Sequence, residues 1–489
     1  MWRFRHFLLV ISFLIISPDT ASPVNVDIND DVYDLLQKLE AKGLIQSSLL
    51  TVKPLNRQEV IRLILEAESN ADEKSPFIRN LVQTLKDRFS HGIDNEQFIK
   101  PLEDPYMQLT YSDSDNSGRL TYNNDGYEYE KDLNARFGVS STAEFEQLSF
   151  HIGPEIRFSK NSAALLAKKA YGSLHFSGFE LEFGKDSQWW GPGHHGSILL
   201  SNNTEPLTIL KLTNPQPFLL PSVFKHLGLF KFVFFATRLE KDRTVANPFL
   251  WGLRAIFKPI PYFELGFSRT ALLGGEGRSD GFKTWVKSFL GKDENVTGGG
   301  GTGDQRAGID LKLTLPFKLQ PVQIYGEMAG EDEAGGFPAK KAYLGGIYLP
   351  GILNMDEFDF RFEYTTTHVA RTANVWYNHG IYTSGYTYRG RIIGHHTGTD
   401  SEDIFLKLQY FLPKTDNGRI SFSYNREKHN LSGKTNETSD EFTLKTDLPF
   451  TKKMNIKTVF TFGTIKNLNN VKGVDIDVSV LMSHLTYKF

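Results

Sequence analysis

The stretch from Phe358 to Tyr364, Phe-Asp-Phe-Arg-Phe-Glu-Tyr, decides the fold class of this chain. Aromatic and charged residues alternate, so an extended backbone puts all the aromatics on one face and all the charges on the other. The same period of two recurs at 263–268, 309–315, 404–410 and 442–448. The pattern predicts strands with one apolar face. By itself it fits a soluble β-sandwich as well as a barrel whose apolar face meets lipid.

Three further observations favour the barrel. From about Tyr106 to the last residue no helical period interrupts the strands, and that run is too long for one sandwich. Roughly 380 residues at ~20 per strand and connection give about 18 strands, within the range of outer-membrane barrels. A last strand ending in an aromatic residue is typical of such barrels, and this chain ends with Leu481, Leu485, Tyr487 and Phe489 separated by polar residues.

We therefore predict a mainly β fold, with a transmembrane antiparallel β-barrel of about 18 strands over residues 101–489. The long polar, glycine-rich inserts, of which 274–303 is the largest, are predicted to be surface loops. The apolar phase flips near Val480, which predicts a β-bulge or a boundary within the last strand.

The N-terminal residues 1–22 are typical of a signal peptide. A basic start at Arg3 and Arg5 precedes an apolar core over 7–16, and Ala21-Ser22 offers small residues at a cleavage point. An anchor helix is the alternative, but ~10 apolar residues fall short of the ~20 that span a bilayer. The sequence predicts export, and a chain without a long apolar helix can cross a membrane only as a barrel.

Residues 23–100 predict three short amphipathic helices. Apolar residues recur at helical spacing between Val32 and Leu39, and Gly43 can end that helix. The run Asn56–Glu59 resembles a capping box, and Pro76 suits the first turn of a third helix. Together they form a small bundle, which either stands alone or plugs a larger structure.

Composition narrows the chemistry. The chain has 489 residues, a net charge of -2, no cysteine and 13% aromatic residues. The near-zero charge gives no case for nucleic acid binding, and the lack of cysteine excludes disulfides and thiol chemistry. No Walker A or H-E-x-x-H motif is present. The calcium-like loop that begins at Asp113 has Asn124 where the bidentate carboxylate belongs, so a polar hairpin loop is the better interpretation.

Two adjacent histidine pairs, His194-His195 and His395-His396, are candidates for metal binding. Adjacent residues on a strand point to opposite faces, so each pair offers at most one ligand per face. A site that spans both pairs is possible, but their spacing gives it no support. We therefore expect no metal and no cofactor.

The segment from Gly184 to Asn203 is the most unusual in the chain. It contains Trp189-Trp190 and a Gly-Pro-Gly turn, which excludes a helix and predicts a rigid aromatic loop at the end of a strand. Residue types alone favour packing or interfacial anchoring for the indoles. The alternative is a sugar platform, in which the indole faces stack on pyranose rings and His194, His195, Asn202 and Asn203 bind hydroxyls.

This loop resembles the hallmark of the outer-membrane capsule assembly Wzi family, a Trp-Trp-Gly-Pro-Gly turn followed by Gly-Ser and Leu-Ser-Asn-Asn. A second block resembles the family over 363–365 and 377–395, and a third over 54–60. The resemblance implies an 18-stranded outer-membrane barrel with a periplasmic helical bundle. It also implies a lectin-like, non-catalytic role in holding capsular polysaccharide or exopolysaccharide. The doubled His194-His195 departs from the family, which usually has a single histidine or tryptophan there.

The expectation is thus a monomeric, non-enzymatic protein of the cell outer membrane that contacts membrane lipid and binds polysaccharide. A saccharide-selective porin and, less favoured, an outer-membrane hydrolase are the alternatives. The resemblance does not imply which glycan is bound. Surface loops determine glycan specificity, and the 274–303 loop looks particular to this chain. The candidate glycan-binding residues are Trp189, Trp190, His194, His195, Asn202, Asn203, Tyr377, His379 and Tyr382.

Overall fold

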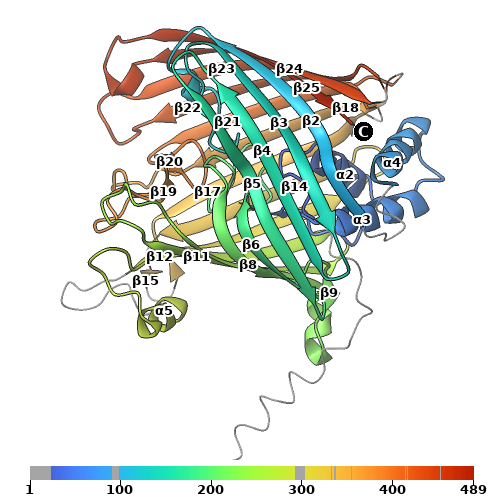
Figure 1. The fold of residues 1–489 in the computed structure, drawn as a ribbon, viewed down its shortest axis with the longest axis horizontal. Coiled ribbons are helices and arrows are strands. Elements are labelled where there is room, and N and C mark those ends of the chain that lie inside the picture. Colours follow the sequence, from blue (N-terminus) through green and yellow to red (C-terminus); the bar gives the residue numbers. More distant parts are fainter. Residues whose placement is uncertain are drawn as a thin grey trace, which may run out of the picture.

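The protein is a closed antiparallel barrel of 18 strands with a helical region in one mouth (Figure 1). A computed structural model describes residues 24–90, 98–291, 303–331, 333–334, 337–353, 355–413, 415, 417–451 and 453–488. The predicted signal peptide lies outside the described residues. The predicted fold class is confirmed.

The barrel strands follow one another around the wall, each pairing with its sequence neighbours. Strand β2 pairs with β25, from Tyr106↔Thr486 to Ser112↔Val480, and this closes the barrel. Strands β8 and β9 both pair with β10, so they form one interrupted strand of the wall. The wall consists of β2 (Phe98–Ser112), β3 (Asp132–Glu144), β4 (Leu148–Phe158), β5 (Ala163–Phe176), β6 (Phe179–Asp186), β8 (Leu207–Thr213), β9 (Phe218–Leu219), β10 (Leu229–Arg238), β11 (Phe249–Ile260), β12 (Phe263–Leu273), β13 (Gly303–Leu315), β14 (Val322–Glu331), β17 (Lys341–Ile352), β18 (Met355–Thr366), β21 (Glu402–Phe411), β22 (Arg419–His429), β23 (Glu437–Pro449), β24 (Met454–Lys466) and β25 (Ile476–Tyr487).

Small elements lie outside the wall. They are β1 (Val52–Lys53), β7 (Trp189–Trp190), the hairpin of β15 (Glu333–Ala334) and β16 (Phe337–Pro338), the hairpin of β19 (Thr387–Tyr388) and β20 (Arg391–Ile392), and the 3₁₀ turns η2 (Ser117–Arg119), η3 (Ser222–Leu227) and η4 (Leu468–Asn470). They fill or border the two mouths of the barrel.

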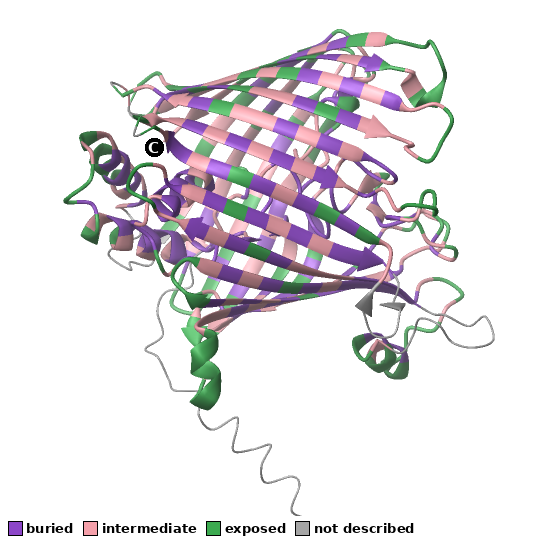
Figure 2. Cartoon of the chain, turned by 180° about the vertical axis from the view of Figure 1, so that it is seen from behind, coloured by how far each residue is buried: buried purple, intermediate pink, exposed green. Residues whose placement is uncertain are grey.

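The wall has its apolar face outside and its charged face inside. Buried residues alternate with half-buried and exposed ones along the strands (Figure 2). On β18, Asp359, Arg361 and Glu363 are at most 4% exposed. One outward row crosses five paired strands, and its side chains are 43–50% exposed: Phe422, Leu444, Phe460, Leu481 and Tyr111. A water-soluble sheet would show the reverse, whereas an apolar outer band is what lipid covers around a membrane barrel.

Two details differ from the prediction. A helix, α5 (Phe282–Phe289), interrupts the strand region. Phe289 stacks on Trp251 of β11, with ring centres 4.3 Å apart, so the wall supports this short helix. The predicted bulge near Val480 is wrong, because β25 pairs with both neighbours in unbroken register. The phase flips there because the loop residue Leu120 covers Val478 and Val480 from inside the barrel.

The helical region forms as its capping residues predict. Helix α2 (Val32–Ala41) is followed by Gly43 at φ 78°. Asn56 caps α3 (Arg57–Ser69) by accepting from the Glu59 amide at 2.9 Å. Ser75 caps α4 (Pro76–Phe89) through the Ile78 amide. Within the described residues, the helices are too short or too polar to cross a membrane.

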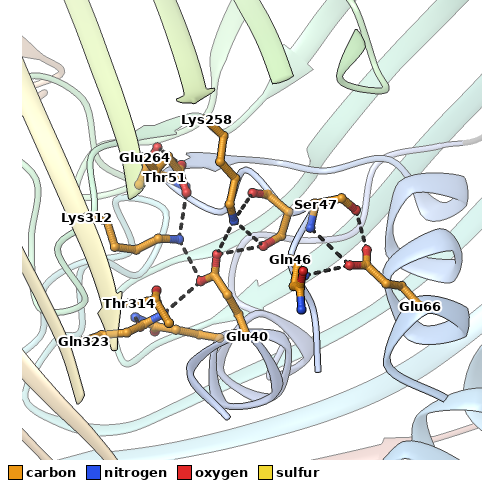
Figure 3. A network of polar contacts seen from close by, with 12 residues as sticks. Glu40, Gln46, Ser47, Thr51, Glu66, Lys258, Glu264, Lys312, Thr314 and Gln323 are labelled. Atoms are coloured by element: carbon orange, nitrogen blue, oxygen red, sulfur yellow. Dashed lines mark hydrogen bonds and ion pairs between the residues drawn. The ribbon is translucent and has the colours of Figure 1, made fainter. Parts of the chain in front are cut away.

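Glu40 of α2 ties the helical region to the inner wall (Figure 3). Its carboxylate accepts from Lys258 of β11 at 2.9 Å, Lys312 of β13 at 2.8 Å and Gln323 of β14 at 2.9 Å. Burial raises the pKa of Glu40, but the two lysines outweigh burial and lower that pKa to about 2. Two lysines that face into the barrel thus find a partner on the helical region.

Candidate functional site

The aromatic loop runs through the interior of the barrel. It leaves the wall at the end of β6 and returns at β8, and its β7 pairs with β1 as Val52↔Trp190 and Lys53↔Trp189. Gly191 lies at φ 136°, and a Cβ there would lie 2.7 Å from the Glu327 carboxylate, so only glycine fits this turn. We call the mouth of the barrel that holds α2 to α4 the helical end, and the opposite mouth the loop end. The segment 187–206 therefore connects the loop end with the helical end.

Both tryptophans are packed inside. Trp190 is fully buried against Phe235, with ring centres 5.2 Å apart, and Trp189 is 5% exposed with the Lys53 ammonium 5.4 Å above its ring. Neither indole nitrogen has a hydrogen-bond partner among the described residues. This geometry favours the packing interpretation, because no face of the Trp190 indole reaches the surface.

We expect Trp190→Ala to lower the free energy of unfolding by about 3–5 kcal/mol, the usual cost of deleting a large buried aromatic. Chemical unfolding of the detergent-solubilised protein measures the change. Exposed Phe282→Ala on α5, 86% exposed, is the control and should cost far less. Unchanged stability together with lost polysaccharide attachment would instead make the indole a sugar contact.

The doubled histidine divides its contacts. The backbone amides of His194 and His195 donate to the two oxygens of Glu363, at 2.7 and 2.8 Å. The His194 ring lies between Asp34 of α2 and Lys407 of β21, at 3.3 Å from each. Burial and the Arg361 charge lower the pKa of His194 to about 3. His194 thus joins the loop to the helical region as a neutral ring.

His195 points instead toward the second histidine pair. Its Nε2 lies 3.5 Å from Asp403 Oδ2, and His396 Nε2 lies 3.4 Å from the same oxygen. Burial lowers the pKa of His195 and of His395; burial also works against charge on His396, but Glu427 raises its pKa to about 10. The two pairs, which are 201 positions apart in the sequence, therefore meet in space.

Residues 377–395, the second block that resembles the family, pack on the aromatic loop. The hydroxyl of Tyr377 donates to Ile198 O at 2.7 Å, and Tyr386 donates to Leu199 O at 3.0 Å. Asn203 donates to Ile392 O at 3.1 Å. Asn202 donates to Asn29 Oδ1 at 2.8 Å, on the segment before α2. The two blocks form one plug within the barrel.

Two other candidates lie farther along the same block. Tyr382 is 1% exposed and donates to Gly274 O at 3.0 Å. His379 is half-buried, and its Nδ1 accepts from the amides of Ile381 and Tyr382 at 3.2 and 3.3 Å. Most of the candidate residues therefore use their polar atoms in hydrogen bonds that hold the plug together.

Two adjoining pockets open at the loop end of the barrel. The first, about 350 Å³, is lined by Tyr122 and Asn203 among others, and we call it the Tyr122 pocket. The second, about 300 Å³, includes Tyr388, and we call it the Tyr388 pocket. Glu128 and Arg391 line both. A larger cavity of about 540 Å³ lies at the opposite end, between the helical region and β2 to β5.

Of the predicted site residues, Asn203 is the one that lines a loop-end pocket. The remaining wall comes largely from residues 115–130 and 388–396. From the sequence, the first of these segments is predicted to be a polar hairpin loop. The aromatic and charged residues Tyr122, Tyr127, Glu128 and Glu130 in that loop were the available signal.

Comparison with known proteins gives consistent relatives. The family model described as capsule assembly protein Wzi matches residues 105–478. An uncharacterized 55.8 kDa protein in the cps region of Klebsiella pneumoniae is 28% identical over 327 residues, which are 65% of this chain and 61% of that protein. The match thus spans less than two thirds of that relative.

Two solved structures share the fold. Escherichia coli Wzi, described as an outer-membrane protein involved in group 1 capsule assembly and as a carbohydrate-binding β-barrel, superposes with a TM-score of 0.74. It is 23% identical, and the match covers 95% of this chain and 99% of that one. Acinetobacter baumannii OccAB2 has a TM-score of 0.51 and 11% identity, covering 79% of this chain and 98% of that one. At these identities the likeness is one of fold.

Proposed function

Because the chain belongs to the capsule assembly protein Wzi family, we propose that it attaches capsular polysaccharide or exopolysaccharide to the cell surface without catalysis. It does so as a barrel of the outer membrane, with lipid around its apolar outer band. The helical region occupies the periplasmic mouth, and the protein works as a monomer. A closed barrel presents no free strand edge for further pairing, which supports the monomer.

The observation that carries the proposal is the pair of adjoining pockets at the loop end. Together they offer tyrosine rings, on which sugar rings can stack, beside charged groups that hydrogen-bond hydroxyls or acidic substituents. Arg391 is held in place because it donates to Asn124 Oδ1 at 3.2 Å and lies 3.7 Å from Glu128. Asn203, Glu205 and residues 388–396 of the two plug segments, 187–206 and 367–401, line these pockets, and the rest of both segments packs behind that lining. The candidate residues Trp189 to Asn203 act here chiefly in that packing.

The side chains that come nearest to a hydrolytic site do not support catalysis. In the described part of the chain, Ser401 Oγ lies 3.1 Å from His429 Nδ1, and His429 Nε2 lies 3.0 Å from Glu427. Ser401, however, is fully buried and its hydroxyl donates to Thr399 O at 2.7 Å. A nucleophile must be reachable by substrate and must give its proton to the histidine. Ser401 meets neither condition.

The test is a pocket variant in cells that lack the wild-type gene. In Glu128→Ala/Arg389→Ala, both side chains are mostly exposed and line the Tyr388 pocket. Loss of two groups at about 1 kcal/mol each should weaken attachment roughly 10- to 30-fold. Cell-attached polysaccharide should fall and released polysaccharide should rise, with the total unchanged.

Lys241→Ala/Asp242→Ala is the matched control, since these exposed residues belong to another loop at the same end and line neither pocket. It should leave attachment unchanged. If gene deletion itself leaves attachment intact while polymer is still made, the attachment role is wrong. If deletion abolishes attachment but the pocket variant does not, the glycan binds elsewhere on the protein.

A further inference from the structure

We propose that His195, His396 and Asp403 form a binding site for a divalent transition metal, of which Zn²⁺ fits best. The three residues come from the aromatic loop, the loop that follows β20, and the start of the wall strand β21. The site adjoins the Tyr122 pocket, because His396 and Glu427 also line that pocket. It goes against the expectation from the sequence, which gave the two histidine pairs no reason to meet.

The distances match a metal polyhedron. Asp403 Oδ2 lies 3.5 Å from His195 Nε2 and 3.4 Å from His396 Nε2. Zinc bonds of about 2.0–2.1 Å in a tetrahedron place neighbouring ligand atoms about 3.3–3.4 Å apart. One ligand atom from each residue lies within 4.8 Å of the others, so a small inward movement of the two rings completes the site.

In the part of the chain that the structure describes, the ligand atoms of His195 and Asp403 lack a hydrogen-bond partner of good geometry, and His396 Nε2 is paired with Glu427 Oε1 at 2.9 Å. Asp403 is 2% exposed and His195 is 7% exposed. Among the described residues, neither oxygen of Asp403 and neither His195 Nε2 nor His396 Nε2 makes a hydrogen bond of good geometry. Buried polar atoms without partners are rare in native proteins because each one costs free energy. A metal at their centre would satisfy all three residues.

The negative charge of the buried carboxylates also favours a bound cation. Asp403 and Glu427 are buried together, and within the described ranges their ion-pair partners are histidines, with no lysine or arginine among them. A divalent cation at this position would offset the charge of both buried carboxylates.

The surroundings orient the ligands. Phe405 stacks on the His195 ring at 3.9 Å, and Tyr122 stacks on the His396 ring at 3.8 Å. Glu427 Oε1 lies 2.9 Å from His396 Nε2 and is the nearest candidate for a fourth ligand. Its other oxygen contacts His429 at 3.0 Å, which fixes the carboxylate. Two imidazoles with carboxylates, in a chain without cysteine, suit zinc better than the hard cations Mg²⁺ or Ca²⁺.

The experiment titrates Zn²⁺ into the full chain, purified in detergent and stripped of metal with a chelator. Calorimetry should show one tight site per chain. His195→Gln and Asp403→Asn should each weaken binding at least roughly 100-fold, because losing a ligand costs more than losing a residue that supports one. His226→Gln is the matched control, because His226 is an exposed histidine on η3 and its loss should leave the tight site intact.

A second measurement needs no variant. X-ray absorption at the zinc edge of the wild-type protein should show four or five nitrogen and oxygen neighbours near 2.0–2.1 Å, with imidazole scattering. The proposal is overturned if wild type binds Zn²⁺ no more tightly than His195→Gln and Asp403→Asn do. It is also overturned if the bound zinc shows only water-like oxygen neighbours.

Discussion

Glu40→Gln should release α2 from the barrel wall. The substitution keeps the size of the side chain but leaves the ammonium groups of Lys258 and Lys312, which are 4% and 3% exposed, without their shared carboxylate. Breaking a buried pair by removing one partner costs about 3–5 kcal/mol. The amides of residues 32–41 should exchange with deuterium much faster, and the thermal unfolding temperature should fall. Glu73→Gln, an exposed glutamate before α4, should change neither quantity.

The same contact predicts a dependence on pH. The pKa of Glu40 falls from about 4.3 in an unfolded chain to about 2 in the folded protein. Its contribution to stability, about 3 kcal/mol, is therefore fully present above the unfolded value and is lost as pH falls toward 2. The difference in stability between wild type and Glu40→Gln should narrow as the pH falls from about 4 toward 2. A gap that stays constant over this range would mean that Glu40 contributes by shape and not by charge.

The intact protein should show no steady open conductance in planar bilayers, although barrels of 16–18 strands usually enclose an aqueous channel. A single buried cluster crosses the lumen. It takes Leu49 and Val52 from the helical end, Trp190 and Ile198 from the aromatic loop, and Trp376 from the second block. These side chains are at most 1% exposed, so water does not reach this cluster.

Removing the aromatic loop should open the channel. Replacement of residues 188–205 by a short Gly-Ser linker takes away β7 and the contacts of the plug with Val52 and Lys53. We expect discrete, large single-channel currents from this variant in planar bilayers. The control shortens the turn between β24 and β25 at residues 469–473, which are exposed. Large currents from the wild type would favour the porin alternative over a plugged barrel.

The sequence predicted the wall well because each residue of a strand carries its own evidence. From Phe358 to Tyr364, aromatic residues alternate with charged ones. The aromatic residues face the lipid and the charged residues face the lumen. The helices were predictable for the same local reason, through Asn56, Ser75 and Pro76. The resemblance of the aromatic loop to the Wzi family was decisive for identity, and the family model matches most of the chain.

The sites were not predictable because they depend on contacts between distant segments. No residue pattern near Trp190 predicts that Phe235 packs against its ring. The meeting of His195 with His396 depends on how two loops fold back into one lumen. Helix α5 is an intermediate case. Its apolar residues Phe282, Trp285, Val286 and Phe289 have helical spacing, but glycine-rich flanks made a loop the simpler interpretation.

The pairing of β7 with β1 has a mechanical consequence. Under the proposed attachment role, flow would drag the bound polymer, and a pull on the Tyr122 pocket would reach residues 190–203 through Asn203, which lines that pocket. The other end of that segment is hydrogen-bonded to Thr51 and paired with Val52, beside the helical region. The load therefore spreads along the barrel axis to a wall whose strands are hydrogen-bonded to their neighbours around the whole circumference. Such bonds must break together under shear, so the barrel resists the pull as one body.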